Sequence, residues 1–121
     1  MGDFRKLKAW QKSQELVESV YRITSGFPAS ERYGLSSQIR RAAVSISANL
    51  AEGCGRMGDT ELRRFVRISL GSLSELECEI LLAARLEMIG QEVSHQLLFS
   101  IGSLRGMLHK LHQILQSKGT G

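Results

Sequence analysis

A chain of 121 residues with one proline and 6% aromatic side chains has the length of a single domain and a composition typical of an all-helical protein. A domain of this size can fold without a disulfide or a metal ion, and its formal net charge of +4 is a mild basic excess. The longest aliphatic run, 80–84, is too short to span a bilayer, and Cys54 and Cys78 form no CxxC motif. We therefore expect a cytoplasmic protein with reduced thiols, no signal peptide and no membrane contact.

Hydrophobic periodicity predicts helices, and no stretch shows the period-two alternation of a strand. The first helix spans about 7–24 and ends before Pro28, because proline removes a backbone donor. The second starts between Ser30 and Ser36, either of which is expected to cap it, and runs to about residue 54.

Two longer helices are expected next, from about 59 to 87 and from about 91 to 117. Four helices with short links pack most simply as an up-and-down antiparallel four-helix bundle. The sequence thus predicts one all-α domain at 1–117 and a disordered C-terminal tail at 118–121.

The second predicted helix carries two neighbouring stripes at helical spacing. The apolar stripe consists of Leu35, Ile39, Ala43, Ile46 and Leu50. The second stripe is small or polar throughout and consists of Gln38, Ala42, Ser45, Asn49, Glu52 and Arg56. An ordinary core stripe is not polar throughout, so we expect this helix to face its own core and a second environment. That environment could be another subunit, a ligand or a water-lined interior, and the stripe as a whole favours a subunit interface.

Asn49 taken alone has a simpler interpretation. A buried amide is costly unless it is hydrogen-bonded, so Asn49 is expected to be a core polar residue bonded to Ser45 or Ser69.

The last predicted helix contains a GxxxG pattern, Gly102 and Gly106, which indicates close packing of two helices. Gly71 and Ser72 could form the surface that it meets, or could lie at a subunit contact.

Basic residues gather in two stretches of the chain. Three lysines lie near the N-terminus: Lys6, Lys8 and Lys12. Six arginines lie in the central part of the sequence: Arg40, Arg41, Arg56, Arg63, Arg64 and Arg67. This asymmetry predicts a basic face for RNA or DNA. The alternative is a solvated surface on which the arginines pair with nearby carboxylates.

The search for catalytic and metal-binding residues is mostly negative. Glu75 and Glu79 lie one helical turn apart and are expected to form a solvated or arginine-paired acidic face. His109 and His112 are three residues apart on the flanks of the last predicted helix, without the convergent ligands that zinc needs. We therefore expect no enzymatic activity, no cofactor and no metal site.

The central block also resembles a known family. The resemblance covers 4–24, 27–56 and 65–83, and is most specific in Gln38, Arg40, Arg41, Ala42, Ser45, Asn49, Ala51, Glu52 and Gly53. Gly71, Ser72, Glu75 and Glu77 of the SLGSLSELE segment support it. On these residues the chain resembles the four-helix-bundle proteins encoded in intervening sequences of bacterial large-subunit ribosomal RNA genes. The accessory variability determinant proteins of diversity-generating retroelements are their relatives. Ser47 departs from the family pattern, which often has proline there.

The resemblance implies a homo-oligomeric ring or barrel of five subunits without enzymatic activity. It further implies, for the retroelement branch, binding to nucleic acid and to a reverse transcriptase through basic surfaces. Together with the arginines, it makes a nucleic-acid-binding scaffold the leading hypothesis. A protein–protein adaptor without nucleic-acid affinity is the alternative, and the sequence leaves open to which branch the chain belongs.

Overall fold

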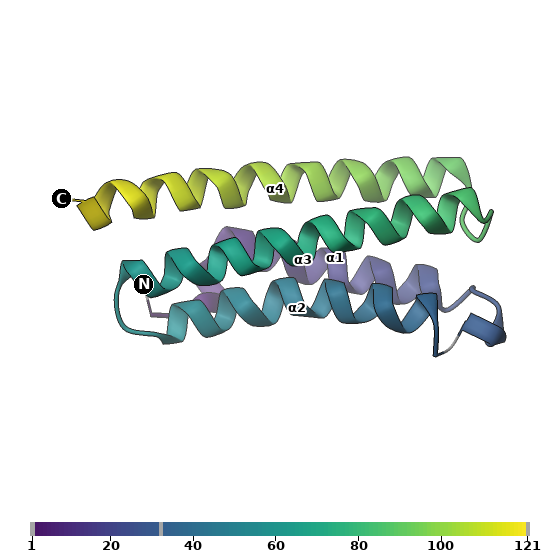
Figure 1. Cartoon of the computed structure of the whole chain (residues 1–121), viewed down its shortest axis with the longest axis horizontal. Coiled ribbons are helices and arrows are strands. Elements are labelled where there is room, and N and C mark those ends of the chain that lie inside the picture. Colours follow the sequence, from purple (N-terminus) through teal and green to yellow (C-terminus); the bar gives the residue numbers. More distant parts are fainter. Residues whose placement is uncertain (1, 32, 121) are drawn as a thin grey trace.

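The structure, a computed structural model, describes residues 2–31 and 33–120 of the chain. Within these residues it contains helices and turns but no strand, and four long helices run up and down as a bundle (Figure 1). The elements are η1 Phe4–Lys6, α1 Lys8–Thr24, η2 Ala29–Glu31, α2 Leu35–Gly55, α3 Asp59–Arg85 and α4 Gln91–Thr120. The predicted all-α four-helix bundle is confirmed. Both termini lie at one end of the bundle, which we call the terminal end, and the α3–α4 connection lies at the other (Figure 1).

The helix boundaries follow the predicted ones closely, with two differences. Neither predicted serine caps α2; instead the backbone N–H of Leu35 donates to the Glu31 carboxylate at 3.0 Å. A carboxylate at a helix N-terminus also complements the helix dipole. At the other end of the chain, α4 continues as helix to Thr120, beyond its predicted end at 117. Of the expected tail, Gly121 lies outside the described residues.

The predicted apolar stripes form one continuous core. All members of the apolar stripe of α2 are buried, and so are Leu97, Ile101, Leu104 and Leu108 of α4. Helix α3 lies between α2 and α4 and packs along both, while α1 closes the bundle against α2 and, less extensively, α4 (Figure 1). Cys54 is buried in this core and Cys78 is exposed, and both are free thiols.

Helices α2 and α3 approach closely where they meet at the terminal end. A Cβ atom added to Gly53 would lie 2.7 Å from the Cβ atom of Phe65 and 3.0 Å from Cδ1 of Leu62. Such distances cannot be accommodated without moving a helix. Gly58 turns the chain between the two helices with a φ of 96°, a conformation that side chains disfavour.

The substitution Gly53→Ala is therefore expected to destabilise the protein by roughly 1–3 kcal/mol, the usual cost of overpacking. In an open helical position the same change stabilises by about 1 kcal/mol. Gly55→Ala is the matched control, because nothing lies within 4 Å of a Cβ atom added at Gly55. Urea unfolding of the two variants measures the difference. A Gly53→Ala variant as stable as the wild type would contradict the close approach.

The GxxxG pattern does not mark a contact inside the protomer. Gly71, Gly102 and Gly106 are exposed, and a Cβ atom added at any of them would meet nothing within 4 Å. The predicted close packing of these glycines against another helix of the same bundle is thus wrong, because they point outward. Their place at a subunit contact stays a prediction.

Candidate nucleic-acid interface

The six central arginines divide among different edges of the bundle. Arg40 lies between α1 and α2, Arg56 and Arg64 lie where α2 meets α3, and Arg63 and Arg67 lie on the side of α3 toward α4. Arg41 is exposed on α2. The structure therefore does not join all six into one surface, and their contacts decide which are free to bind a polyanion.

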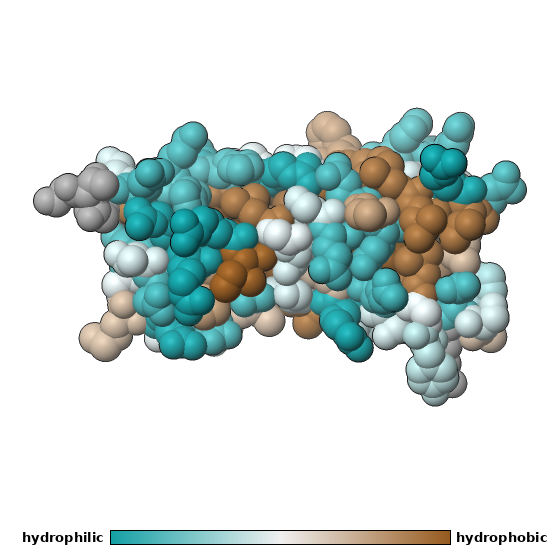
Figure 2. Space-filling model, viewed as in Figure 1, coloured by the Kyte–Doolittle hydropathy of each residue, from teal (hydrophilic) through white to brown (hydrophobic). Residues whose placement is uncertain are grey.

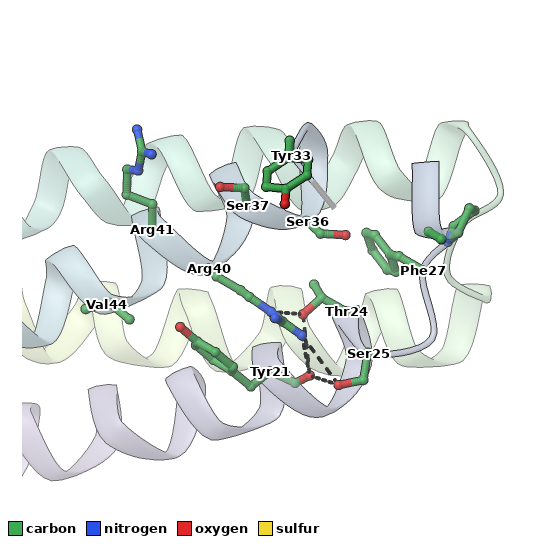
Figure 3. A pocket seen from close by; sticks show the side chains of 12 residues that line it. Tyr21, Thr24, Ser25, Phe27, Tyr33, Ser36, Ser37, Arg40, Arg41 and Val44 are labelled. Carbon is green, nitrogen blue, oxygen red and sulfur yellow. Dashed lines mark hydrogen bonds between the residues drawn. The ribbon is translucent and has the colours of Figure 1, made fainter. Parts of the chain in front are cut away.

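Arg40 is committed to the fold. Its Nε atom donates to Oγ1 of Thr24 at 2.7 Å, and its guanidinium stacks 4.5 Å from the ring centroid of Tyr21. Longer hydrogen bonds of 3.4 Å reach the carbonyl of Tyr21 and the hydroxyl of Ser25 (Figure 3). These acceptors lie in the last turn of α1 and at Ser25, the residue that follows it, and the Tyr21 carbonyl also accepts the backbone N–H of Ser25 at 3.2 Å. The geometry makes Arg40 a cap for the C-terminal end of α1.

A groove of about 700 Å³ opens beside Arg40, between the end of α1 and the start of α2. It is lined by aromatic and hydroxyl side chains, among them Phe27, Tyr33 and Ser36, and Arg41 points away from Arg40 and Tyr21 (Figure 3). Arg40 and Arg41 both line the groove, but the guanidinium of Arg40 is already bound to the end of α1. Arg41, which is exposed, is therefore the lining residue whose charge remains available to a phosphate.

Arg56 and Arg64 are paired with carboxylates. Arg56 donates to Glu52 at 2.7 Å and Arg64 donates to Glu61 at 3.1 Å, and both guanidiniums lie over the ring of Phe65. The hydrogen bonds from Arg64 hold the pKa of Glu61 below its usual value, and the hydrogen bond to Glu52 raises the pKa of Arg56. For these two arginines the alternative interpretation, a surface of local ion pairs, describes the structure.

Arg63 and Arg67 form a different arrangement. Within the described part of the chain they make no ion pair or side-chain hydrogen bond. Their positive charges act on His112 of α4, which is one turn from His109 on the same helix. Two turns before His112, Arg105 donates to Glu77 at 2.8 Å and fixes the register of α3 and α4. We call the surface formed by Arg63, Arg67, His109 and His112 the α3–α4 seam.

The predicted N-terminal lysines lie at the same end of the bundle as the seam. Lys6 is in η1 and Lys8 starts α1, both exposed, while Lys12 is half-buried. None of the three makes an ion pair among the described residues. Arg5, by contrast, is bound to Asp3 at 3.0 Å. Hydrophilic side chains accordingly gather over the terminal end (Figure 2).

The polar stripe of α2 faces α3 of the same protomer. The hydroxyls of Ser45 and Ser72 are hydrogen-bonded at 2.9 Å, and Ser69 donates to the carbonyl of Ile46 at 3.0 Å. The amide of Asn49 donates to the carbonyl and hydroxyl of Ser45 at 2.8 and 3.0 Å, which confirms the predicted Asn49–Ser45 bond. Gln38 and Glu52, at the outer edge of the stripe, are exposed. A hydroxyl network between α2 and α3 thus explains the inner part of the stripe, and a second subunit could cover only its outer edge.

The acidic face predicted for Glu75 and Glu79 is wrong for Glu79. Glu79 is 8% exposed, and its Oε1 atom is buried without a hydrogen-bond partner among the described residues. Burial, together with the charge and the hydrogen bond of Glu75, raises the pKa of Glu79 to about 7. Glu75 itself is exposed, so the two residues form one buried and one solvated carboxyl group. The physical reason is that Glu79 lies seven residues after Ser72, on the flank of α3 that packs toward α2.

Two further features are absent from the residues that the structure describes. In residues 2–31 and 33–120, no three His, Cys, Asp or Glu side chains come together as a metal ion would require. None of the helices described combines the length and apolarity that crossing a bilayer demands.

Fold and surface together define a small basic four-helix bundle. A model of the 23S rRNA-intervening sequence protein family matches residues 5–110, and the chain belongs to that family. The resemblance stated from the central block is thus confirmed. The crystal structure of a protein of unknown function from the S23 ribosomal protein family of Bacteroides thetaiotaomicron superposes with a TM-score of 0.81. The two chains are 21% identical, and the match covers 87% of this chain and 95% of the other, which shows a shared fold. A search of curated proteins found no match.

The sequence identified the cationic residues but not how they are distributed among the edges of the bundle. The two histidines of the seam were treated only as possible metal ligands, because a flank position on α4 does not show which helix lies beside it. The signal that was missed is the register of α3 and α4, in which Arg63 and Arg67 share a flank of α3 with Glu77. Glu79 was missed for the same kind of reason, since its burial depends on the rotation of α3 about its axis.

Proposed function

We propose that this protein is a non-enzymatic cytoplasmic scaffold that associates with copies of itself and binds RNA or DNA through phosphate contacts. The observation that carries the proposal is a group of cations at the terminal end that are free of ion pairs within the described residues, namely Lys6, Lys8, Lys12, Arg63 and Arg67. Cations without internal partners can release counterions from a polyanion, which is the main source of non-specific nucleic-acid affinity.

Self-association is supported by apolar surface away from the terminal end. Hydrophobic side chains gather toward the α3–α4 connection (Figure 2), where Leu82 and Leu86 are about half exposed, and Phe99 on α4 is 79% exposed. An exposed apolar patch of this kind is typical of an interaction surface. The five-subunit ring is implied by the family resemblance. Such a ring would present five copies of the α3–α4 seam and raise the avidity for nucleic acid without new contacts.

The experiment that tests nucleic-acid binding compares two double variants with the same charge. Arg63→Ala/Arg67→Ala removes free cations, whereas Arg56→Ala/Arg64→Ala removes cations that are already paired. Binding of labelled RNA and DNA is measured between about 50 and 200 mM salt. The first variant is expected to lose affinity on the order of tenfold and to reduce the salt slope by roughly 2, one for each phosphate contact. The second is expected to change both far less.

Three results would reject the proposal: no binding of the wild type at low salt, binding that does not depend on salt, or equal losses in the two variants. In the first case the adaptor becomes the better hypothesis. The exposed Leu82, Leu86 and Phe99 favour it, because they would serve a protein partner equally well. A reverse transcriptase is the proposed partner only if the chain belongs to the retroelement branch.

A further inference from the structure

The groove between the end of α1 and the start of α2 combines aromatic, hydroxyl and cationic side chains. Its volume of about 700 Å³ lies within the range of roughly 300–1,000 Å³ that small-molecule sites occupy. Two of the described lining residues are arginines and none is acidic. Glu31, which precedes α2, is not among them, and its carboxylate accepts the backbone N–H of Leu35. The described lining of the groove therefore offers no negative charge to repel an anion.

The aromatic rings of the groove differ in how far solvent reaches them. Tyr33 is 88% exposed. Tyr21 is 42% exposed, and the guanidinium of Arg40 lies 4.5 Å from its ring centroid. Phe27 is buried. Of these rings, Tyr33 is thus the one that a ligand arriving from solvent reaches most easily.

Arg41 is the cation that stands on the same side of the groove as Tyr33. It is exposed, and in the described part of the chain it makes no ion pair and no side-chain hydrogen bond. Ser37 lies one helical turn before Arg41, and Tyr33, Ser37 and Arg41 follow one another along the start of α2 (Figure 3). An accessible ring and an available guanidinium therefore lie at the two ends of a short row, with a hydroxyl between them.

We propose that this groove binds one unstacked nucleotide of a single-stranded nucleic acid, with the base on the ring of Tyr33 and a phosphate at Arg41. The inference rests on the proposed function and names single strands as the preferred ligand. Aromatic side chains stack on any base, because every base has a π-face. In a duplex the bases are paired and stacked on one another, so only an unpaired strand can offer a base to Tyr33. The hydroxyls of Ser36 and Ser37 supply donors and acceptors for the sugar or the edge of the base.

The groove is separate from the cations of the terminal end. It lies at the end of the bundle that carries the α3–α4 connection (Figure 1), and the 21 residues of α2 place the two ends about 30 Å apart. Phosphates of either a duplex or a single strand can contact the cations of the terminal end. Loss of the groove is therefore expected to weaken the binding of single strands selectively.

The test compares a short labelled polyadenylate RNA with an RNA duplex of the same length, both at constant low salt. Tyr33→Ala is expected to weaken binding of the single strand by roughly fivefold or more, the effect of losing one base stack, and to leave duplex binding unchanged. Tyr33→Phe keeps the ring and is the matched control, with the wild-type affinity for both ligands. Arg41→Ala is expected to lower the affinity for the single strand and to reduce its salt slope by roughly 0.7, the share of one phosphate contact.

The groove and the proposed function fail by different results. A Tyr33→Ala variant that binds the single strand as tightly as the wild type would overturn the groove as a base-binding site, and so would equal losses for strand and duplex. Both results leave nucleic-acid binding itself intact. Absence of any binding by the wild type at low salt rejects the groove and the proposed function together. Displacement of the RNA by a polyglutamate peptide that depends on Tyr33 would make the groove a site for an acidic protein segment instead.

A second measurement locates the bound base without a substitution. Ultraviolet light couples a bromouridine in the bound strand to an aromatic side chain on which it stacks, and mass spectrometry identifies that residue. The expected site of coupling is Tyr33. A crosslink found only at Trp10, a half-buried ring of α1 near the terminal end, would contradict the proposal.

Discussion

Replacing Glu79 with glutamine is expected to stabilise the protein by about 3 kcal/mol at pH 8 and to change its stability little at pH 4. The pKa of Glu79 is raised from 4.5 to about 7, and a difference of that size corresponds to about 3 kcal/mol between the two protonation states. Because the pKa is higher in the folded state, the stability contributed by the neutral acid is complete below pH 4.5. It is lost as the pH rises toward 7, where the folded state must accept a buried charge.

Urea unfolding at a fixed protein concentration measures this effect, since self-association would otherwise change the apparent stability. The wild type is expected to lose stability between pH 5 and 7, roughly the window between the two pKa values, and Glu79→Gln is expected to lack that loss. Glu18→Gln, on an exposed position of α1, is the control and should follow the wild type. If Glu79→Gln retains the wild-type pH profile, Glu79 is not a buried carboxyl group in solution.

The second large effect is a loss of stability expected on replacing Arg40. It distinguishes the role of Arg40 from that of Arg41, its neighbour in the sequence. Arg40→Ala removes the charged donor that binds the hydroxyl of Thr24 and the carbonyl of Tyr21, and hydrogen bonds of this kind contribute about 1.5–3 kcal/mol. The variant is expected to lose about that much stability while retaining nucleic-acid affinity. Arg41→Ala carries the same change in charge at an exposed site, and is expected to keep its stability.

Thermal or urea unfolding and an RNA titration of both variants make the comparison complete. The result that would contradict the assignment is an Arg40→Ala variant that folds as stably as the wild type but binds RNA less tightly. In that case Arg40 would be a surface cation, as the sequence alone predicts. Arg41, which is exposed and lines the same groove, would then be no better a candidate for binding than its neighbour.

The fold could be predicted because the information lies in local spacing. Leu35 to Leu50 recur every three or four residues, and Gly53, Gly55 and Gly58 interrupt the pattern where α2 gives way to α3. The bond from Asn49 to Ser45 was predictable for the same reason, since residues four apart on a helix are neighbours. These features need no knowledge of how one helix is placed against another.

The site could be predicted only in part, because its residues are defined by the rotation of each helix about its axis. Arg63 and Arg64 are adjacent in sequence and about 100° apart on α3, so one faces α4 and the other pairs with Glu61 beside Phe65. The sequence placed both in a single basic group. The polar stripe of α2 shows the same limit, because spacing revealed a second neighbour for this helix but not that α3 would be that neighbour.

The central claim is that several copies of this bundle together present the α3–α4 seam to a nucleic acid. Sedimentation velocity of the wild-type protein with a fluorescent RNA, followed at the wavelength of the label in about 50 mM salt, tests it most directly. The label is expected to sediment with a particle several times heavier than the 13.4 kDa protomer. A label that stays free, or that moves with a single protomer, would contradict the claim.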